Sequence, residues 1–430
     1  MWRIVLLAVM VLFQAAFSMP TSKTQPSDST DSALSVDSLL ARIKRLEAKV
    51  HQLELARQRE ALEKLKQKAR AGLSKPKTAN RLPERKFVQG SRTLTAFNPE
   101  ISLVGDQFFV FNRRKGATDT RTDLQRGFVF RTFEVNFRSN LDPFSQGRAT
   151  LEINEDGIEL SEVYAVWSNL LPHINLAAGR FRQRFGVVNR WHEDALDQIF
   201  YPLVLTEFFG EDGLAQLGVS VDWLIPSRGR LASELTVQVA APQNDAMFSG
   251  TPFGLPTVLT HWKNFFDLGA ASYFEVGFTG MAGANDQRGF TLSGDHRWSR
   301  LGGVDFTYSW TPPGRGNYRG LTWRNEFYFA AKDTTFQETA HAWGGYSYLD
   351  YRLNRRWYAG VRLDVVSPLD RPQKSAYMWQ TTPYLTYWQS EFVFLRMEFQ
   401  HLEGHKLSAL DNRFLLQLNW VVGPHRHEKY

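Results

Sequence analysis

Between residues 91 and 430 the chain alternates apolar and polar residues with a period of two. Phe133, Val135 and Phe137 alternate with polar neighbours, and the runs 304–310 and 414–422 follow the same pattern. Successive side chains of a strand point to opposite faces, so each run predicts a strand with one apolar face. Runs of about ten residues with aromatic side chains near their ends are typical of membrane-spanning β-strands. We therefore expect an all-β fold, a transmembrane antiparallel β-barrel.

Sixteen such segments can be placed along the chain. They lie at about 104–112, 127–138, 147–154, 157–168, 173–182, 215–224, 231–241, 268–281, 287–298, 302–310, 319–331, 341–351, 356–366, 376–388, 391–401 and 412–422. With a periplasmic N-terminus, connections after even-numbered strands should be short turns and the others outer loops. Most connections obey this rule. The tight NEDG after the third strand and SRLGG after the ninth do not, which leaves the count open by two.

An even number of strands closes a barrel without free edges, which lipid cannot tolerate. The alternative from the same pattern is an exported β-sandwich or propeller. Its strands would be shorter, with turn signals every 8–12 residues, and a propeller would repeat with a blade-like period. No such repeat is visible in the sequence.

The first 34 residues read as an export signal followed by a polar tract. Arg3 precedes the apolar run 4–13, and small residues at Ala16 and Ser18 precede a cleavage point. This layout predicts a signal peptide at residues 1–18, because the apolar run is too short to span a bilayer as a helix. Residues 19–34 are rich in Ser, Thr and Pro and are expected to be disordered.

A heptad pattern follows at residues 35–72. Val36, Ile43 and Val50 alternate with three leucines, Leu39, Leu46 and Leu53. Three a/d heptads predict a short coiled-coil helix, expected in the periplasm; the alternative is one amphipathic helix lying on its own protein. Residues 73–90, rich in Pro, Lys and Arg, are expected to form an extended linker before the barrel at 91–430.

The charge is distributed unevenly along the chain. Residues 1–90 hold 17 of the 51 Lys and Arg and 8 of the 44 Asp and Glu, a net charge of +9; residues 91–430 hold 34 and 36, a net charge of −2. The basic residues thus fall on the helix and linker of an exported chain, which argues against nucleic acid as a partner. The absence of cysteine suits an oxidising compartment.

The longest connection of the expected barrel begins in GRFRQRFGVVNRWHED, residues 179–194. Arg180, Arg182 and Arg184 stand two residues apart, so an extended chain would project three guanidinium groups from one face. Leu176 and Ala178 share their parity, so all three arginines can face the lumen only if the strand is bulged near Gly179. The alternative is that Arg182 and Arg184 lie beyond the membrane and pair with acidic residues of the connection. Those acidic residues are Glu193, Asp194 and Asp197.

Three segments carry a resemblance to a known group. NPEISLVGD (98–106), AAGRFRQRFGVVNRWHED (177–194) and YPLVLTEFFGEDGLAQLGVSVDWLIP (201–226) are similar to bacterial outer-membrane proteins related to the phosphate-selective porins. Some members of that group carry the label zinc-regulated TonB-dependent outer membrane receptor. The resemblance covers residues 36–430, and FFGEDGL is its most specific part.

The resemblance implies a sixteen-stranded barrel in the outer membrane of a Gram-negative bacterium, commonly a trimer, whose third outer loop folds inward to narrow a pore. Aromatic and aliphatic residues of the connection could pack it against the wall: Phe200, Tyr201, Leu203, Val204, Phe208 and Phe209. The charged candidates for the constriction are Arg180, Arg182, Arg184, Arg190, Glu193 and Asp194. Opposed charges across a narrow passage would orient polar solutes.

Histidines are the only candidates for a metal site. His192 precedes Glu193 and Asp194, and His401 and His405 flank Glu403 in an expected outer loop. His425 and His427 precede Glu428 at the C-terminal end. Zinc needs three or four converging ligands, and two His four residues apart provide them reliably only on a helix. Solvated loop histidines are therefore the default, and we expect no metal and no cofactor.

The function that these patterns favour is a porin, a channel passing small hydrophilic solutes or ions, anions among them, by diffusion. Two alternatives stay open: a substrate- or metal-specific outer-membrane receptor, and a barrel that tethers the envelope through its helix. A TonB-dependent transporter would need a plug domain that the length does not allow. No GxSxG motif is present, and the SxxK match at 74–77 lies in the linker, so we expect no enzyme.

Overall fold

The computed structural model describes residues 99–112, 127–226, 229–244, 246–249, 254–286, 296–334, 338–369, 377–404 and 411–424. The chain divides into two compact units, 1–85 and 86–430. The expected signal peptide, polar tract, coiled coil and linker all lie outside the described residues, and so do His405 and the C-terminal histidines.

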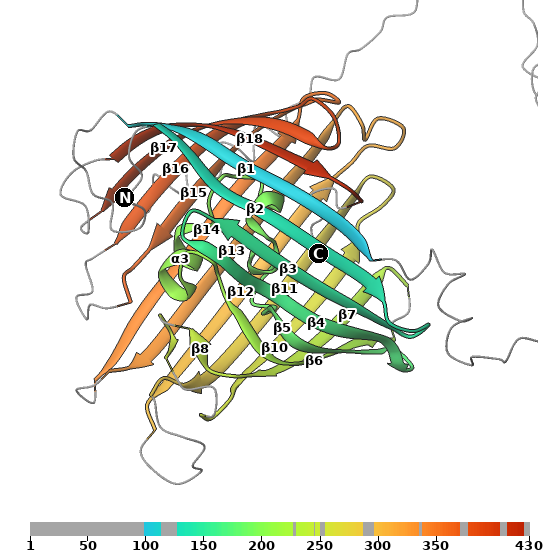
Figure 1. Cartoon of the computed structure of the whole chain (residues 1–430), viewed down its shortest axis with the longest axis vertical. Coiled ribbons are helices and arrows are strands. Elements are labelled where there is room, and N and C mark those ends of the chain that lie inside the picture. Colours follow the sequence, from blue (N-terminus) through green and yellow to red (C-terminus); the bar gives the residue numbers. More distant parts are fainter. Residues whose placement is uncertain are drawn as a thin grey trace, which may run out of the picture. The chain divides into compact units, whose positions relative to one another are not determined.

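Sixteen strands of the described residues form one closed antiparallel barrel (Figure 1). Their bounds are β1 Glu100–Asn112, β2 Gly127–Asn140, β3 Ser145–Asn154, β4 Gly157–Leu171, β5 Ile174–Arg182, β6 Ala215–Ile225, β7 Leu231–Ala240, β10 Thr257–Asp267, β11 Ser272–Ala284, β12 Trp298–Trp310, β13 Gly320–Asp333, β14 Thr339–Arg352, β15 Trp357–Val366, β16 Met378–Trp388, β17 Val393–Gly404 and β18 Asp411–Val422. The first and last strands close the ring, with Leu103 opposite Val422. The expected all-β closed barrel is confirmed.

On most strands the apolar face points outward and the polar face inward. On β6, Leu217, Val219 and Val221 are exposed, whereas Ser220 and Asp222 between them are buried inside the barrel. An apolar exterior around a polar interior is the pattern of barrels surrounded by lipid. None of the helices in the described part of the chain is long and apolar enough to cross a membrane.

The number of strands was predicted correctly, but two assignments were wrong. Strand β10 was missed, because both its inward side chains (Leu259, His261) and its outward ones (Val258, Thr260) mix polar and apolar types. Of the segment placed at 287–298, residues 287–295 lie outside the described residues; residues 296 and 297 are not in a strand, and Trp298 begins β12, which pairs directly with β11.

The segment SRLGG, which did not fit the expected rule of short and long connections, is not a connection at all, because these residues lie inside β12. Its glycines weakened the sequence pattern. A Cβ at Gly303 would lie 2.8 Å from Phe185, a residue that packs inside the barrel, so the small residue makes room for an interior side chain. The tight outer turn between β3 and β4 is real and spans Asn154 to Gly157.

The remaining elements are short. Within 183–214 lie the 3-10 turns η2 Val188–Arg190 and η3 Glu193–Ala195 and the helix α3 Leu203–Phe209; the pair β8 Gln243–Asn244 and β9 Phe248–Ser249 follows β7. The apolar core consists mainly of side chains from 183–214 packed against inward-facing residues of the barrel wall.

Candidate functional site

The connection between β5 and β6, residues 183–214, turns into the barrel; we call it the inner loop. Gly186 makes the turn possible. Its φ of +63° favours glycine, and a Cβ at this position would lie 1.9 Å from Oε2 of Glu326 on β13. Oε1 of the same carboxylate accepts hydrogen bonds from the backbone N–H groups of Val187 (3.2 Å) and Val188 (3.0 Å). The wall thus binds the loop at its entry.

Two Arg–acid pairs of the wall bind the middle of the inner loop. Arg362 on β15 donates to the carbonyl of Phe200 at 2.7 Å and to Asp364 at 2.8 Å, and Asp364 accepts from the backbone N–H of Leu203 at 3.1 Å. On β17, Arg396 donates to the carbonyl of Leu196 at 2.8 Å, and Glu398 accepts from the N–H of Ile199 at 2.6 Å. Charged groups here satisfy the backbone of a buried loop, which would otherwise lose its hydrogen bonds to water.

Apolar contacts complete the attachment. Phe185 and Phe209 pack edge to face with ring centroids 5.3 Å apart, and the ring of Tyr328 on β13 lies 4.9 Å from that of Phe185. Phe200 is half-buried against Phe108 of β1. The expected packing residues are confirmed in this role, and all but Phe200 are fully buried: Tyr201, Leu203, Val204, Phe208 and Phe209.

The three arginines of 180–184 do not lie in one line. Arg180 stands opposite Val163 and Leu217, which are exposed on the outer face, and its guanidinium contacts the carbonyl of Ser161 (3.1 Å) and Glu159 (3.6 Å). Gly179, with a φ of +137°, precedes it. Arg180 therefore points outward, as Leu176 and Ala178 do at the alternate positions before it.

Arg182 and Arg184 lie inside the barrel but do not pair with the acidic residues predicted for them. Arg182 is buried and donates to the carbonyl of Asp212 at 2.6 Å. Arg184 bonds Glu234 of β7 and lies 3.1 Å from Asp222 of β6. No ion pair joins either arginine to Glu193, Asp194 or Asp197 as expected: Arg182 lies beside Glu152 and Glu162, whose charges act on it together with that of Glu193, and Arg184 turns toward β6 and β7.

Acidic wall residues face the cations of the inner loop. Arg190 is partly exposed, and burial and the nearby Arg184 lower its pKa to about 10, so it stays charged at neutral pH. Three carboxylates act electrostatically on Arg190, those of Glu234, Glu275 and Asp305. Lys263 adds a cation on this wall, 2.8 Å from Glu275. A transverse charge separation therefore exists between the loop and strands β7, β11 and β12.

Glu193 and Asp194 point to other partners. Glu193 lies 3.2 Å from Arg131 of β2, which also bonds Asp106 of β1. Burial raises the pKa of Glu193 to about 7, although the charge of Arg131 acts in the opposite direction. Asp194 is buried, and its charge acts on Glu134 of β2.

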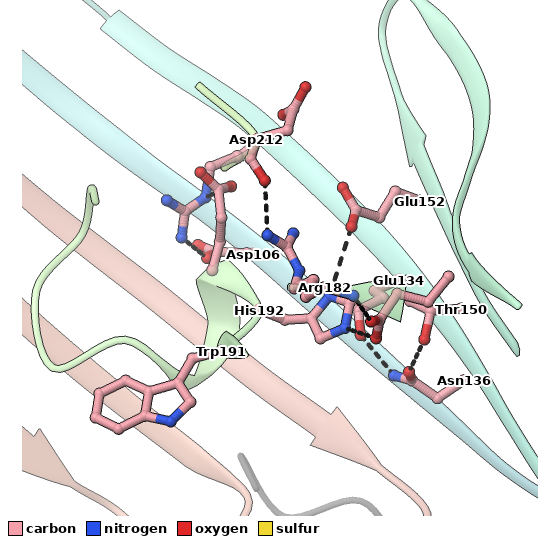
Figure 2. A network of polar contacts seen from close by, with 12 residues as sticks. Asp106, Glu134, Asn136, Thr150, Glu152, Arg182, Trp191, His192 and Asp212 are labelled. Carbon is pink, nitrogen blue, oxygen red and sulfur yellow. Dashed lines mark hydrogen bonds and ion pairs between the residues drawn. The ribbon is translucent and has the colours of Figure 1, made fainter. Parts of the chain in front are cut away.

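His192 lies among three glutamates that the sequence did not connect with it. Its Nε2 is 2.7 Å from Oε2 of Glu162 (β4), and its Nδ1 is 3.6 Å from both Glu134 (β2) and Glu152 (β3). Figure 2 shows Glu134 and Glu152 converging on the ring. Burial lowers the pKa of His192, but the surrounding carboxylates outweigh it and hold that pKa well above the usual value.

The other histidine candidate within the described residues is part of the wall. His401 belongs to β17 rather than to an outer loop, because that strand continues to Gly404. Its Nδ1 lies 2.7 Å from Oδ1 of Asn412, and its ring packs on Trp379. These contacts give His401 a structural role in the sheet.

A cavity lies beside His192. It is a small opening lined by residues of β1–β4 together with His192 and Pro424. Its polar lining residues include Asn136, Thr150 and Glu162.

Comparison with known proteins identifies the fold. No family model matches the chain. An uncharacterized protein of Aquifex aeolicus (strain VF5) is 25% identical over 385 residues, covering 77% of this chain and 79% of that protein. Two solved structures of OmpT, an outer membrane protein of Vibrio cholerae, match with a TM-score of 0.50 each. They are a loop L8 deletion mutant (10% identity) and the in-vitro folded trimer form (9%), and each match covers 76% of this chain and 100% of that chain. At this identity the likeness shows a shared sixteen-stranded barrel fold.

Proposed function

We propose that this chain is an outer-membrane porin through which small hydrophilic solutes or ions diffuse passively. The observation that carries the proposal is the inner loop: it is bound to the wall at both its entry and its middle, inside a barrel that is apolar outside and polar inside. Such an arrangement sets a fixed width for water-filled passages beside the loop. The proposal includes no catalytic step, cofactor or energy source.

The assembly proposed is a homo-oligomer in the outer membrane of a Gram-negative bacterium, with a trimer favoured. One of the two OmpT structures above is described as a trimer form, which supports this choice by analogy of fold. Lipid is the partner of the outer apolar band, which includes Leu217, Val219 and Val221 on β6.

Charge selection is proposed to occur between the inner loop and strands β6, β7, β11 and β12. Arg184 and Arg190 supply positive charge from the loop, and Asp222, Glu234 and Asp305 supply negative charge from the wall. Opposed charges at a low-dielectric constriction create a field across the path of the solute. The sign of the ion selectivity then depends on a small difference between the positive charge of the loop and the negative charge of the wall, and one substitution can change that difference.

The test is single-channel recording in a planar bilayer under a KCl gradient. Arg184→Ala and Arg190→Ala should each move the zero-current potential toward cation selectivity. A unit charge a few Å from an ion is worth about 1 kcal/mol even in bulk water, so a change of about twofold or more in the permeability ratio is expected.

Arg180→Ala is the matched control, because Arg180 belongs to the same segment but lies on the outer face. It should leave the potential unchanged. Folded barrels that produce no conductance steps would contradict the porin. Equal shifts in all three variants would contradict the location of the selective region.

A further inference from the structure

The ring of His192 is held in one orientation by a carboxylate on only one of its nitrogens. Nε2 lies 2.7 Å from Oε2 of Glu162, a hydrogen-bond distance, while Nδ1 makes no hydrogen bond although the side chain is only 4% exposed. A buried polar atom without a partner is costly in a folded protein. The position of Nδ1 therefore requires an explanation.

Nδ1 is aimed at two carboxylates that are too distant for hydrogen bonds. Oε2 of Glu134 and Oε1 of Glu152 each lie 3.6 Å away, and the three atoms lie within 4.8 Å of one another. Two ligands of a tetrahedral zinc ion, each bound at about 2.0–2.2 Å, are separated by about 3.4 Å. The separations from Nδ1 to the carboxylates thus match those of atoms that share a metal ion.

The surrounding residues support the same geometry. Glu162 accepts the hydrogen of Nε2, which directs the lone pair of Nδ1 toward the other two glutamates, as carboxylates do for metal-bound histidines. The second oxygen of Glu134 accepts from Asn136 at 2.7 Å, and Asn136 accepts from Thr150 at 2.8 Å, a chain visible in Figure 2. His192 and Glu134 are thereby held in place by side chains other than the three that face one another.

The charges favour a dication. Glu134, Glu152 and Glu162 carry three negative charges, and Arg182, whose charge acts on Glu152 and Glu162, carries one positive charge. With a neutral imidazole and all three carboxylates ionised, these groups sum to −3 + 1 = −2, so a divalent ion offsets more of the negative charge than a single proton on His192 does. Asp194 adds a further negative charge that acts on Glu134.

We propose that Glu134, Glu152 and Nδ1 of His192 bind a divalent transition-metal ion, with Glu162 as the residue that positions the ring. One nitrogen and two carboxylate oxygens suit zinc-like ions better than Mg²⁺ or Ca²⁺, which prefer oxygen ligands alone. The cavity beside His192, which Glu162 also lines, brings open space up to the ring of the histidine. A bound ion would tie the inner loop to β2 and β3, whereas Arg184 ties it to β6 and β7.

The test uses the full-length protein in detergent, stripped with EDTA and titrated with Co²⁺ and then Zn²⁺. We expect one Co²⁺ per chain, with the intense visible absorption of a four-coordinate site that Zn²⁺ removes, and a higher unfolding temperature with either ion. His192→Ala and Glu134→Gln should each weaken binding about 100-fold or more, and Glu162→Gln by about 10–100-fold, as for other positioning residues of metal sites.

Two controls separate this site from adventitious binding. Glu159→Gln removes an exposed carboxylate of β4, and a double His425→Ala/His427→Ala variant removes the C-terminal histidines; both should bind as the wild type does. If the variants at 192 and 134 do not fold, X-ray absorption of the zinc-loaded wild type decides, since the site predicts one imidazole and otherwise oxygen ligands. Absence of stoichiometric binding, or a spectrum without imidazole, would overturn the proposal and leave His192 as a protonated partner of the glutamates.

Discussion

The carboxylate of Glu326 on β13 accepts a hydrogen bond from the backbone N–H of Val188 at 3.0 Å, although the two residues are 138 positions apart. The same side chain accepts from the hydroxyls of Tyr328 and Tyr346 and from the N–H of Val187. Glu326 is fully buried. One carboxylate therefore joins two strands of the wall to the entry of the inner loop.

Replacing Glu326 should loosen the inner loop in graded steps. Glu326→Ala leaves buried donors without an acceptor, at a cost of about 1–3 kcal/mol for each. We expect larger open-channel noise and a higher conductance, because the loop entry can then move. Glu326→Gln keeps one acceptor oxygen and should give an intermediate effect. If the alanine variant conducts exactly like the wild type, this anchor does not determine the width of the passage.

The close approach of Gly186 to Glu326 gives a second prediction. Gly186→Ala combines a left-handed backbone with a Cβ placed 1.9 Å from the Glu326 carboxylate, so the loop must shift. The backbone term alone costs about 1–3 kcal/mol. We expect a lower unfolding temperature together with altered conductance.

Gly210→Ala provides the comparison for that experiment. Gly210 also has a positive φ, +94°, but a Cβ there would meet nothing within 4 Å. It should reduce stability through the backbone term and leave conductance close to that of the wild type. Equal effects on conductance in the two variants would show that steric contact with Glu326 is unimportant.

Strands with one uniformly apolar face were predictable from the sequence, since each such strand buries polar and exposes apolar side chains in strict alternation. Strand β10 was not, because Trp262 and Thr260 share its outer face and Leu259 and His261 its inner face. Residues 257–267 form a strand because they pair with β7 and β11, and such pairing depends on contacts that the local pattern does not contain.

The candidate site was predictable only in its position along the chain. The longest connection does fold inward, but neighbouring residues in it meet different partners: His192 lies beside Glu162 of β4, whereas Glu193 lies beside Arg131 of β2. A compact 3-10 turn separates side chains that look like one cluster in the sequence. The sequence predicts that Glu134 points into the barrel, because it alternates with the apolar residues Phe133 and Val135. It does not predict that Glu134 lies close to His192.

Deletion of residues 35–70 tests the expected coiled coil. The barrel closes through pairing of β1 with β18, which involves residues from 103 onward, so single-channel conductance should be unchanged. If the heptads help to hold an oligomer, semi-native electrophoresis should show easier dissociation into monomers. Full-strength oligomers with a loosened cell envelope would instead favour the tether, and loss of the pore would contradict both interpretations.

The last prediction concerns the buried pair Arg362–Asp364, which binds the middle of the inner loop. Arg362 is 1% exposed, so Arg362→Met leaves the charge of Asp364 buried without its partner, at a cost of about 3–5 kcal/mol. Asp364→Asn in addition removes that charge but keeps an oxygen that can accept from the N–H of Leu203. The double variant should therefore recover part of the loss, with a coupling free energy of about 1–3 kcal/mol in urea unfolding from lipid vesicles.

The exposed pair Arg180–Glu159 supplies the reference cycle, where coupling should stay below about 1 kcal/mol. Additive effects of the two substitutions in the Arg362 cycle would mean that the pair does not act as one anchor, and that the loop is held by its apolar contacts instead.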